Sequence, residues 1–137
     1  LEFYYTSIKS KRVVIISDND STITRDEFYN NSSLEITSRN TIKNMAIQSF
    51  SVYDIIIIDT MAYIKSFRYE IYCACKAQRQ KHLILHVSTD IEKCIVMNSN
   101  KDSTRYSETT IRSIVDRFEY PNLNDRWDFP LLSVDIY

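Results

Sequence analysis

Residues Ile55-Ile56-Ile57-Ile58-Asp59-Thr60 form the stretch that decides the fold class, because four β-branched residues stand directly before a carboxylate. An unbroken apolar run is typical of a strand that helices cover on both faces. An Asp at the carboxyl end of such a strand lies where open α/β sheets bind their ligands. We therefore predict a buried strand that ends in a ligand-binding carboxylate. A core strand with a capping Asp is the alternative, since short apolar runs are ambiguous.

Strand patterns and helix patterns alternate on both sides of this stretch. The predicted strands are Arg12 to Ser17, Tyr53 to Asp59, His82 to Ser88 and Leu131 to Val134. The segments between them have helical spacing, at Ser33 to Phe50, Ile64 to Gln80, Asp90 to Asn98 and Ser107 to Phe118. This alternation predicts an α/β fold with a parallel sheet, helices on both faces and right-handed crossovers.

Composition predicts a single globular domain within the cell. The 137 residues are 44% hydrophobic and 26% charged, with a net charge of -1, so the chain carries no electrostatic signature of DNA binding. We find no apolar run of membrane-spanning length and no signal peptide pattern, and we expect no membrane partner. Cys73, Cys75 and Cys94 lack metal-site spacing and cannot all pair, which favours reduced thiols in the cytoplasm or also the nucleus.

Two longer stretches resemble the signatures of one protein family. They are Tyr63-Ile64-Lys65-Ser66-Phe67-Arg68-Tyr69-Glu70 and Arg117-Phe118-Glu119-Tyr120-Pro121-Asn122-Leu123-Asn124-Asp125-Arg126-Trp127-Asp128-Phe129-Pro130-Leu131-Leu132. Both are similar to motifs of the Kti-twelve proteins, the Elongator-associated P-loop ATPases of the killer-toxin-insensitivity group. A third, weaker match is Ser32 to Arg39, so the resemblance spans nearly the whole chain.

The resemblance implies a P-loop NTPase-like fold that binds ATP and Mg²⁺ and supports Elongator-dependent modification of wobble uridines in tRNA. Elongator and tRNA are the implied partners. In P-loop enzymes a carboxylate in the position of Asp59 helps to hold Mg²⁺ against the nucleotide phosphates, so Asp59 is predicted as metal ligand, cofactor-binding and catalytic residue. Asp18 follows the first predicted strand and is a second cofactor-binding candidate, although it would equally cap the following turn.

Three arginines complete the predicted site. Arg68 and Arg117 are expected to be catalytic and Arg126 to bind the cofactor. For Arg68 the alternatives are a role in positioning its helix or a surface ion pair of little energetic value. We expect a guanidinium of Arg117 or Arg126 to reach phosphate or to pack on Trp127, which Lys does poorly. His82 and His86 share one face of a strand and are expected to be buried rather than bound to metal.

The chain contains no glycine, so no Walker A loop can be assigned. We interpret residues 1–137 as an incomplete P-loop NTPase-like domain that starts at the end of the helix after that loop, near Leu1 to Tyr5, with a lid-like segment at about 98–106. The family's C-terminal tRNA-binding region is also expected to be absent. With the family strand order 2-3-1-4-5, a missing first strand leaves a gap between the third and fourth strands, so we expect residues 1–137 alone to be marginally stable or to fold with altered strand pairing.

Two other functions stay open. One is a non-catalytic scaffold or pseudoenzyme that docks to Elongator without nucleotide. It is favoured by the missing glycines and by departures from the family pattern at polar or glycine positions: Ser33, Ile36, Ala62, Ser66, Asp125 and Phe129. The other is a phosphotransferase similar to the related seryl-tRNA(Sec) kinases.

Overall fold

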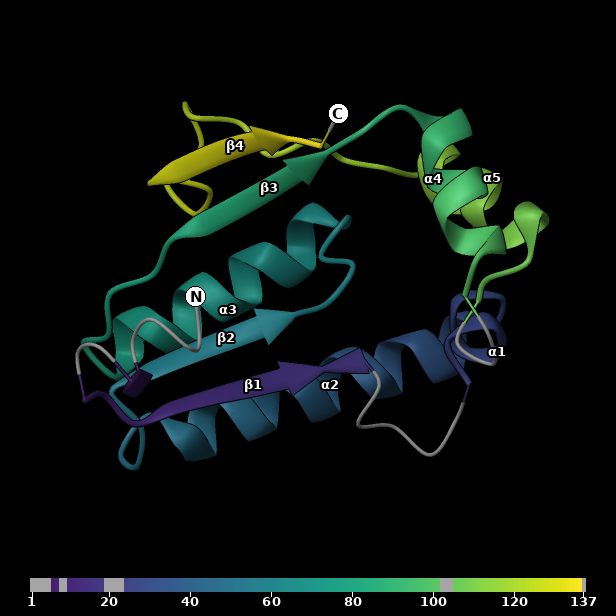
Figure 1. Ribbon diagram of the computed structural model, residues 1–137. Coiled ribbons are helices and arrows are strands. Elements are labelled where there is room, and N and C mark those ends of the chain that lie inside the picture. Colours follow the sequence, from purple (N-terminus) through teal and green to yellow (C-terminus); the bar gives the residue numbers. More distant parts are fainter. Residues whose placement is uncertain (1–5, 8–9, 19–23, 102–104, 137) are drawn as a thin grey trace.

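The computed structural model describes residues 6–7, 10–18, 24–101 and 105–136, in which strands and helices alternate (Figure 1). The elements are β1 (Val13–Ser17), α1 (Arg25–Tyr29), α2 (Ser32–Ser49), β2 (Ile55–Asp59), α3 (Lys65–Ala77), β3 (Ile84–Ser88), α4 (Ile91–Ser99), α5 (Glu108–Asp116) and β4 (Leu131–Asp135). This confirms the α/β class, and each predicted strand and helix is present within a few residues of its expected bounds. The helix end expected at Leu1 to Tyr5 lies outside the described residues.

Within the described part of the chain, no helix combines the length and hydropathy needed to cross a membrane.

The described strands form two separate parallel pairs. β1 pairs with β2, and β3 pairs with β4, with Val13 opposite Ile55 and Ile84 opposite Leu131. In Figure 1 the four arrows point the same way, and the pair β3–β4 stands apart from the pair β1–β2. The break falls between β2 and β3. In the family order, which counts the missing strand as the first, these are the third and fourth strands, so the break is where the gap was expected.

Helices α2 and α3 pack on the same face of the β1–β2 pair. Their buried residues Ile42, Ala46 and Phe67 form one core cluster with Ile16. Because side chains alternate along a strand, Val14, Ile56 and Ile58 join this cluster while Ile15 points to the opposite face and is 40% exposed. The apolar run of β2 thus has described helices on one of its two faces.

Helix α1 was not predicted from the sequence. It spans five residues, too few for helical periodicity to show, but Thr24 and Glu27 form a capping box at its start. The Thr24 hydroxyl accepts from the Glu27 amide at 3.4 Å, and the Glu27 carboxylate accepts from the Thr24 amide at 3.1 Å. This local motif, Thr-x-x-Glu, was the available signal for the helix.

Arg79 ends α3 in a conformation that usually belongs to glycine. Its φ is 54°, and the surrounding hydrogen bonds, Gln80 N to Cys75 O at 2.8 Å and Arg79 N to Lys76 O at 3.2 Å, form a Schellman motif. A Cβ atom in this left-handed region is unfavourable. The absence of glycine from the chain therefore has a local energetic cost here.

We predict that Arg79→Gly raises the free energy of unfolding by about 1 kcal/mol, because it removes the Cβ penalty at this position. Urea denaturation followed by circular dichroism measures the change. Arg79→Ala is the matched control and should gain much less, since it keeps a Cβ. An equal gain in both variants would assign the effect to the lost charge instead.

An ion pair joins the chain segments that lead into β1 and β2. Arg12 donates from its amide to Asp54 Oδ2 at 2.9 Å and from Nη2 to Oδ1 at 3.2 Å. These hydrogen bonds from Arg12 hold the pKa of Asp54 down to about 2. The pair thus favours the register in which the two strands start together.

A carboxylate whose pKa is lowered by folding stabilises the fold above its unfolded pKa of about 3.9, and the contribution is lost as pH falls through the folded value. We therefore predict that acidification from pH 4 to pH 2 lowers the melting temperature of the wild-type chain more than that of Asp54→Asn. Thermal melts at matched ionic strength measure this difference. Identical pH profiles for the two chains would contradict the assignment.

Candidate functional site

Two carboxylates lie at the carboxyl ends of adjacent parallel strands. Asp59 is the last residue of β2 and stands opposite Ser17, so Asp18 follows β1 at the same edge. Asp59 is exposed, whereas Asp18 is 3% exposed. This is the edge at which open α/β sheets bind ligands, as the sequence predicted.

Among the described residues, Asp18 is held through one of its two oxygens. Its Oδ2 accepts from the Tyr29 hydroxyl at 2.9 Å and from the Met61 amide at 3.4 Å. Its Oδ1 is buried and accepts no hydrogen bond from any residue that the structure describes. A buried polar atom without a partner is costly and marks a strained or functional position. The turn that Asp18 was expected to cap begins at residue 19, outside the described residues.

Tyr29 keeps its proton in this site. Burial, with the negative charge of Asp18 next, raises the pKa of the Tyr29 hydroxyl above its ordinary value. The hydroxyl is therefore a permanent donor to Asp18. Tyr29 belongs to α1, the helix that sequence analysis missed, so its role in the site was missed with it.

Arg68 is buried rather than exposed. Its Nε donates to Asp128 Oδ1 at 2.8 Å and its Nη2 to Oδ2 at 3.3 Å, while Nη1 donates to the Ala62 carbonyl at 2.9 Å. The side chains of this pair are 3% and 0% exposed. The predicted alternative of a surface ion pair is wrong in its location, because the carboxylate partner comes from the far end of the chain and both charges are desolvated. The contact positions α3 against the C-terminal segment.

The two segments that carry the family resemblance contact each other around the start of α3. The Lys65 amide donates to Glu119 at 2.5 Å, which caps a helix whose N-cap residue, Ile64, offers no side-chain acceptor. The Glu119 amide in turn donates to the Tyr63 carbonyl at 3.0 Å. Lys65 Nζ lies 2.8 Å from Asp125. Similar sequence at two distant places therefore reflects one shared contact surface.

Arg117 lies over the ring of Tyr63. Its guanidinium is 5.3 Å from the ring centroid and 3.5 Å from the carboxylate of Glu35, and its side chain is 42% exposed. The Tyr63 hydroxyl also donates to Glu35, at 2.5 Å. Glu35 lies in the weaker family match and was not predicted as a site residue, yet its carboxylate is 3% exposed and joins two predicted segments.

The structure corrects the predicted partner of Trp127. The cation over its ring is Lys65, with Nζ 5.0 Å from the centroid, rather than a guanidinium of Arg117 or Arg126. Arg126 is exposed and lies beside Tyr69. Lys65 takes the position because Asp125 and Trp127 both flank it.

The two histidines are half-buried rather than fully buried. His82 lies 3.1 Å from the Trp127 carbonyl through Nε2, and the His86 ring contacts Phe118 and Tyr120. Both therefore pack against the C-terminal segment.

The loop after β2, residues 60–63, connects most of the predicted site. Met61 donates to Asp18, the Ala62 carbonyl accepts from Arg68, and the Tyr63 ring lies beneath Arg117. Asp59 directly precedes this loop. Four of the five predicted site residues thus converge on one short segment, whereas the exposed Arg126 lies beside Tyr69.

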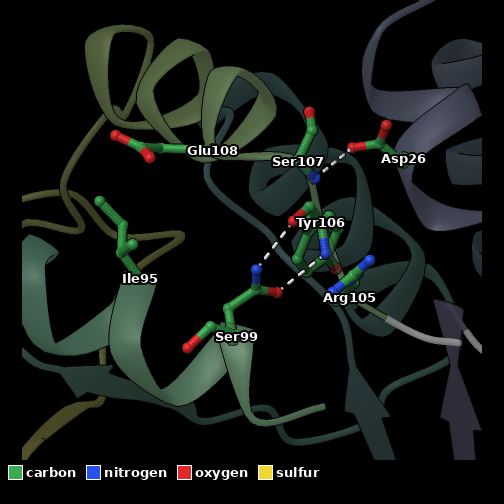
Figure 2. Close-up of a pocket in the computed structure, with 8 residues that line it drawn as sticks. Asp26, Ile95, Ser99, Arg105, Tyr106, Ser107 and Glu108 are labelled. Carbon is green, nitrogen blue, oxygen red and sulfur yellow. Dashed lines mark hydrogen bonds between the residues drawn. The ribbon is translucent and has the colours of Figure 1, made fainter. Parts of the chain in front are cut away.

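A hollow of about 470 Å³ opens next to the predicted lid (Figure 2). It is lined by Asp26, Ile95, Asn98, Ser99, Arg105, Tyr106, Ser107 and Glu108. The predicted lid, 98–106, forms much of its rim, although residues 102–104 lie outside the described residues. The ring of Tyr106 packs edge-on to that of Tyr29 at 5.8 Å, which links the hollow to the donor that holds Asp18.

Asp26, which lines the hollow, connects α1 to the start of α5. Its Oδ1 accepts from the Ser107 amide at 2.8 Å and from the hydroxyl of the fully buried Thr110 at 2.6 Å. Desolvation opposes ionisation of Asp26, but these hydrogen bonds outweigh it and hold its pKa below the ordinary value. The carboxylate is therefore charged at neutral pH and fixes α1 to the start of α5.

The donor set at the strand ends suits Mg²⁺ rather than a transition metal. Among the described residues no group of three or more His, Cys, Asp or Glu side chains could enclose a metal ion. Mg²⁺ binds through one or two carboxylates plus substrate phosphates and water, so the exposed carboxylate of Asp59 fits that ion.

Parallel strands joined by helices, with one carboxylate directly after β1 and another at the end of β2, are the architecture of a P-loop NTPase-like α/β domain. A family model described as "Chromatin associated protein KTI12" matches residues 1–137. The chain belongs to the KTI12 family.

Individual relatives agree. The chain is 34% identical to Protein kti12 of Schizosaccharomyces pombe over 126 residues, which covers 92% of this chain and 44% of that protein. It is 32% identical to a Protein KTI12 homolog of Xenopus laevis over 125 residues, covering 90% and 46% respectively. The chain thus spans less than half the length of these curated relatives.

A solved structure has the same architecture. The crystal structure of Chaetomium thermophilum Kti12 in complex with ADP-AlF3 superposes with a TM-score of 0.85 at 28% identity, covering 98% of this chain and 78% of that one. The relative placement of the two strand pairs therefore matches that of a solved relative.

We predict that Arg68→Met lowers the free energy of unfolding by about 3–5 kcal/mol, because it leaves the carboxylate of Asp128 buried without its partner. The double variant Arg68→Met/Asp128→Leu should recover part of this loss, since no unpaired charge remains. Chemical denaturation measures all three chains. Glu70→Ala removes the exposed pair with Lys43 and should cost at most about 1 kcal/mol. A loss of similar size in Arg68→Met and Glu70→Ala would contradict the buried pair.

Proposed function

We propose that this chain is the Walker B-containing part of an ATP-binding protein that supports Elongator-dependent modification of wobble uridines in tRNA. The observation that carries the proposal is the pair of carboxylates, Asp18 and Asp59, at the ends of two adjacent parallel strands. Asp59 is exposed toward solvent and supplies a ligand to Mg²⁺. Asp18, oriented by Tyr29, lies at the same edge, and its buried Oδ1 accepts no hydrogen bond from the described residues.

The family supports nucleotide as the ligand. Kti12 of Chaetomium thermophilum was crystallised in complex with ADP-AlF3, and this chain has the same fold over nearly all its length. Mg²⁺ between the carboxylates and the phosphates would neutralise charge on the phosphate oxygens. Residues 1–137 contain no glycine, so in this proposal they supply the metal side of the site and not the phosphate cradle.

The arginines take different roles in this proposal. Arg68 positions the loop after β2, because the hydrogen bonds of its guanidinium go to the Asp128 carboxylate and the Ala62 carbonyl. Arg117 is partly exposed beside that loop and is the cation best placed to meet developing phosphate charge. Arg126 is exposed and remains a cofactor-binding candidate from the family signature.

We predict that residues 1–137 bind a fluorescent ADP analogue weakly and that Mg²⁺ strengthens this binding. Asp59→Asn should remove the Mg²⁺ enhancement, because an amide is a much poorer ligand than a carboxylate for this ion. Fluorescence anisotropy with Mg²⁺ or EDTA measures the effect. Asp116→Asn, an exposed carboxylate at the end of α5, is the matched control and should bind as wild type does. Binding that is equal with EDTA and in Asp59→Asn would contradict a metal role for Asp59.

A non-catalytic scaffold is the second candidate, and the absence of glycine favours it. In that case the chain docks to Elongator in the cytoplasm or nucleus without nucleotide. Co-purification with Elongator after nucleotide has been removed by apyrase separates the two functions. Retention of Elongator together with no detectable ADP binding would support the scaffold, whereas nucleotide-dependent retention would support the ATP-binding function.

A further inference from the structure

The backbone of Tyr106, just before α5, is fixed by a side chain from the last turn of α4. Asn98 Nδ2 donates to the Tyr106 carbonyl at 2.8 Å, and the Tyr106 amide donates to Asn98 Oδ1 at 2.8 Å. One side-chain amide therefore satisfies both backbone polar groups of Tyr106. The next residue is held as well, because the Ser107 amide donates to Asp26 Oδ1 at 2.8 Å (Figure 2). Residues 106 and 107 are thus tied to both α4 and α1.

The ring of Tyr106 contacts the ring of Tyr29. Their centroids lie 5.8 Å apart at an interplanar angle of 62°, an edge-on arrangement that aromatic pairs favour. Tyr63, from the loop after β2, contacts Tyr29 at 6.1 Å. Phe28 does so at 4.3 Å, but it belongs to the same helix. Because Tyr29 is the last residue of the five-residue α1, the contacts from outside this helix fix where its side chain lies.

The place of the Tyr29 hydroxyl matters because it makes the shorter of the two described hydrogen bonds to Asp18. The hydroxyl donates to Oδ2 at 2.9 Å, whereas the Met61 amide lies at 3.4 Å, which is long for such a bond. The buried Oδ1 accepts none from the described residues. If the Tyr29 side chain turned away, a carboxylate that is 3% exposed would keep one long hydrogen bond. Its orientation therefore depends on Tyr29.

We propose that Tyr106 is a positioning residue for Asp18: with its backbone fixed by Asn98, its ring holds Tyr29 in the orientation that donates to this carboxylate. Tyr106 acts through Tyr29 and not on the ligand itself. The start of α5, far from β1 in the sequence, thereby helps to set the geometry of the strand-end site. The inference rests on the proposed function only in counting Asp18 as part of the ligand-binding edge.

NMR spectra of isotope-labelled residues 1–137, recorded without nucleotide at neutral pH, test the proposal. The side-chain carboxyl carbon of Asp18 and the ring signals of Tyr29 report directly on their hydrogen bond. Asn98→Ala should move both sets of signals, because it removes both bonds to the Tyr106 backbone, while the amide signals of β2 stay in place. Asn100→Ala is the matched control, since it changes the exposed residue that ends the same helix, and it should leave all these signals unchanged.

A second pair of variants tests the ring contact and decides the question even if Asn98→Ala does not fold. Tyr106→Leu should move the Asp18 and Tyr29 signals, whereas Tyr106→Phe keeps the ring and should give signals close to those of the wild type. Unchanged signals in Tyr106→Leu would overturn the proposal. Equal shifts in Tyr106→Leu and Tyr106→Phe would also overturn it, because the ring would not be the link.

Nucleotide binding separates this inference from the proposed function. If the wild-type chain binds the fluorescent ADP analogue, Tyr106→Leu should weaken that binding and Tyr106→Phe should preserve it. Equal binding by Tyr106→Leu and the wild type would overturn the positioning role. Failure of the wild-type chain to bind the analogue would count against the proposed function alone, since the NMR signals decide whether Tyr106 positions Asp18.

Discussion

The buried ion pair between Arg68 and Asp128 is the constraint on which much of this structure depends. Both side chains are almost fully desolvated, so neither charge is tolerated without the other. The pair also brings together residues 60 positions apart and fixes the start of α3 against the segment that leads into β4. Because β1–β2 and β3–β4 share no ladder, side-chain contacts of this kind connect the two halves.

The loop after β2 carries this constraint into the site. The Arg68 guanidinium donates to the Ala62 carbonyl of this loop, and the neighbouring Met61 amide donates to Asp18. The contact of Arg68 with the C-terminal segment therefore helps to define where the two strand-end carboxylates lie. Arg117 on the Tyr63 ring adds a third restraint. The family signatures therefore describe a support for the strand-end carboxylates as much as a set of reacting groups.

The strands and the longer helices were predictable because their patterns are local. The fold class was predictable from the alternation of apolar runs with segments of helical spacing. The four isoleucines before Asp59 were enough to place this carboxylate at the carboxyl end of a strand. The short α1, and with it Tyr29, was missed because five residues show no period. The burial of Arg68 was also not predictable, nor was the position of Lys65 on the ring of Trp127. Both depend on contacts between segments far apart in the chain.

The position of the metal is the most direct test of the account. Mn²⁺ replaces Mg²⁺ in many phosphate sites and broadens the NMR signals of nearby nuclei, so titration of ADP-saturated, isotope-labelled chain with Mn²⁺ would locate the ion. The account predicts that broadening is strongest at Asp18, Asp59 and Thr60, and weak at the far end of α3. Broadening centred on another carboxylate cluster, with these three signals unaffected, would contradict it.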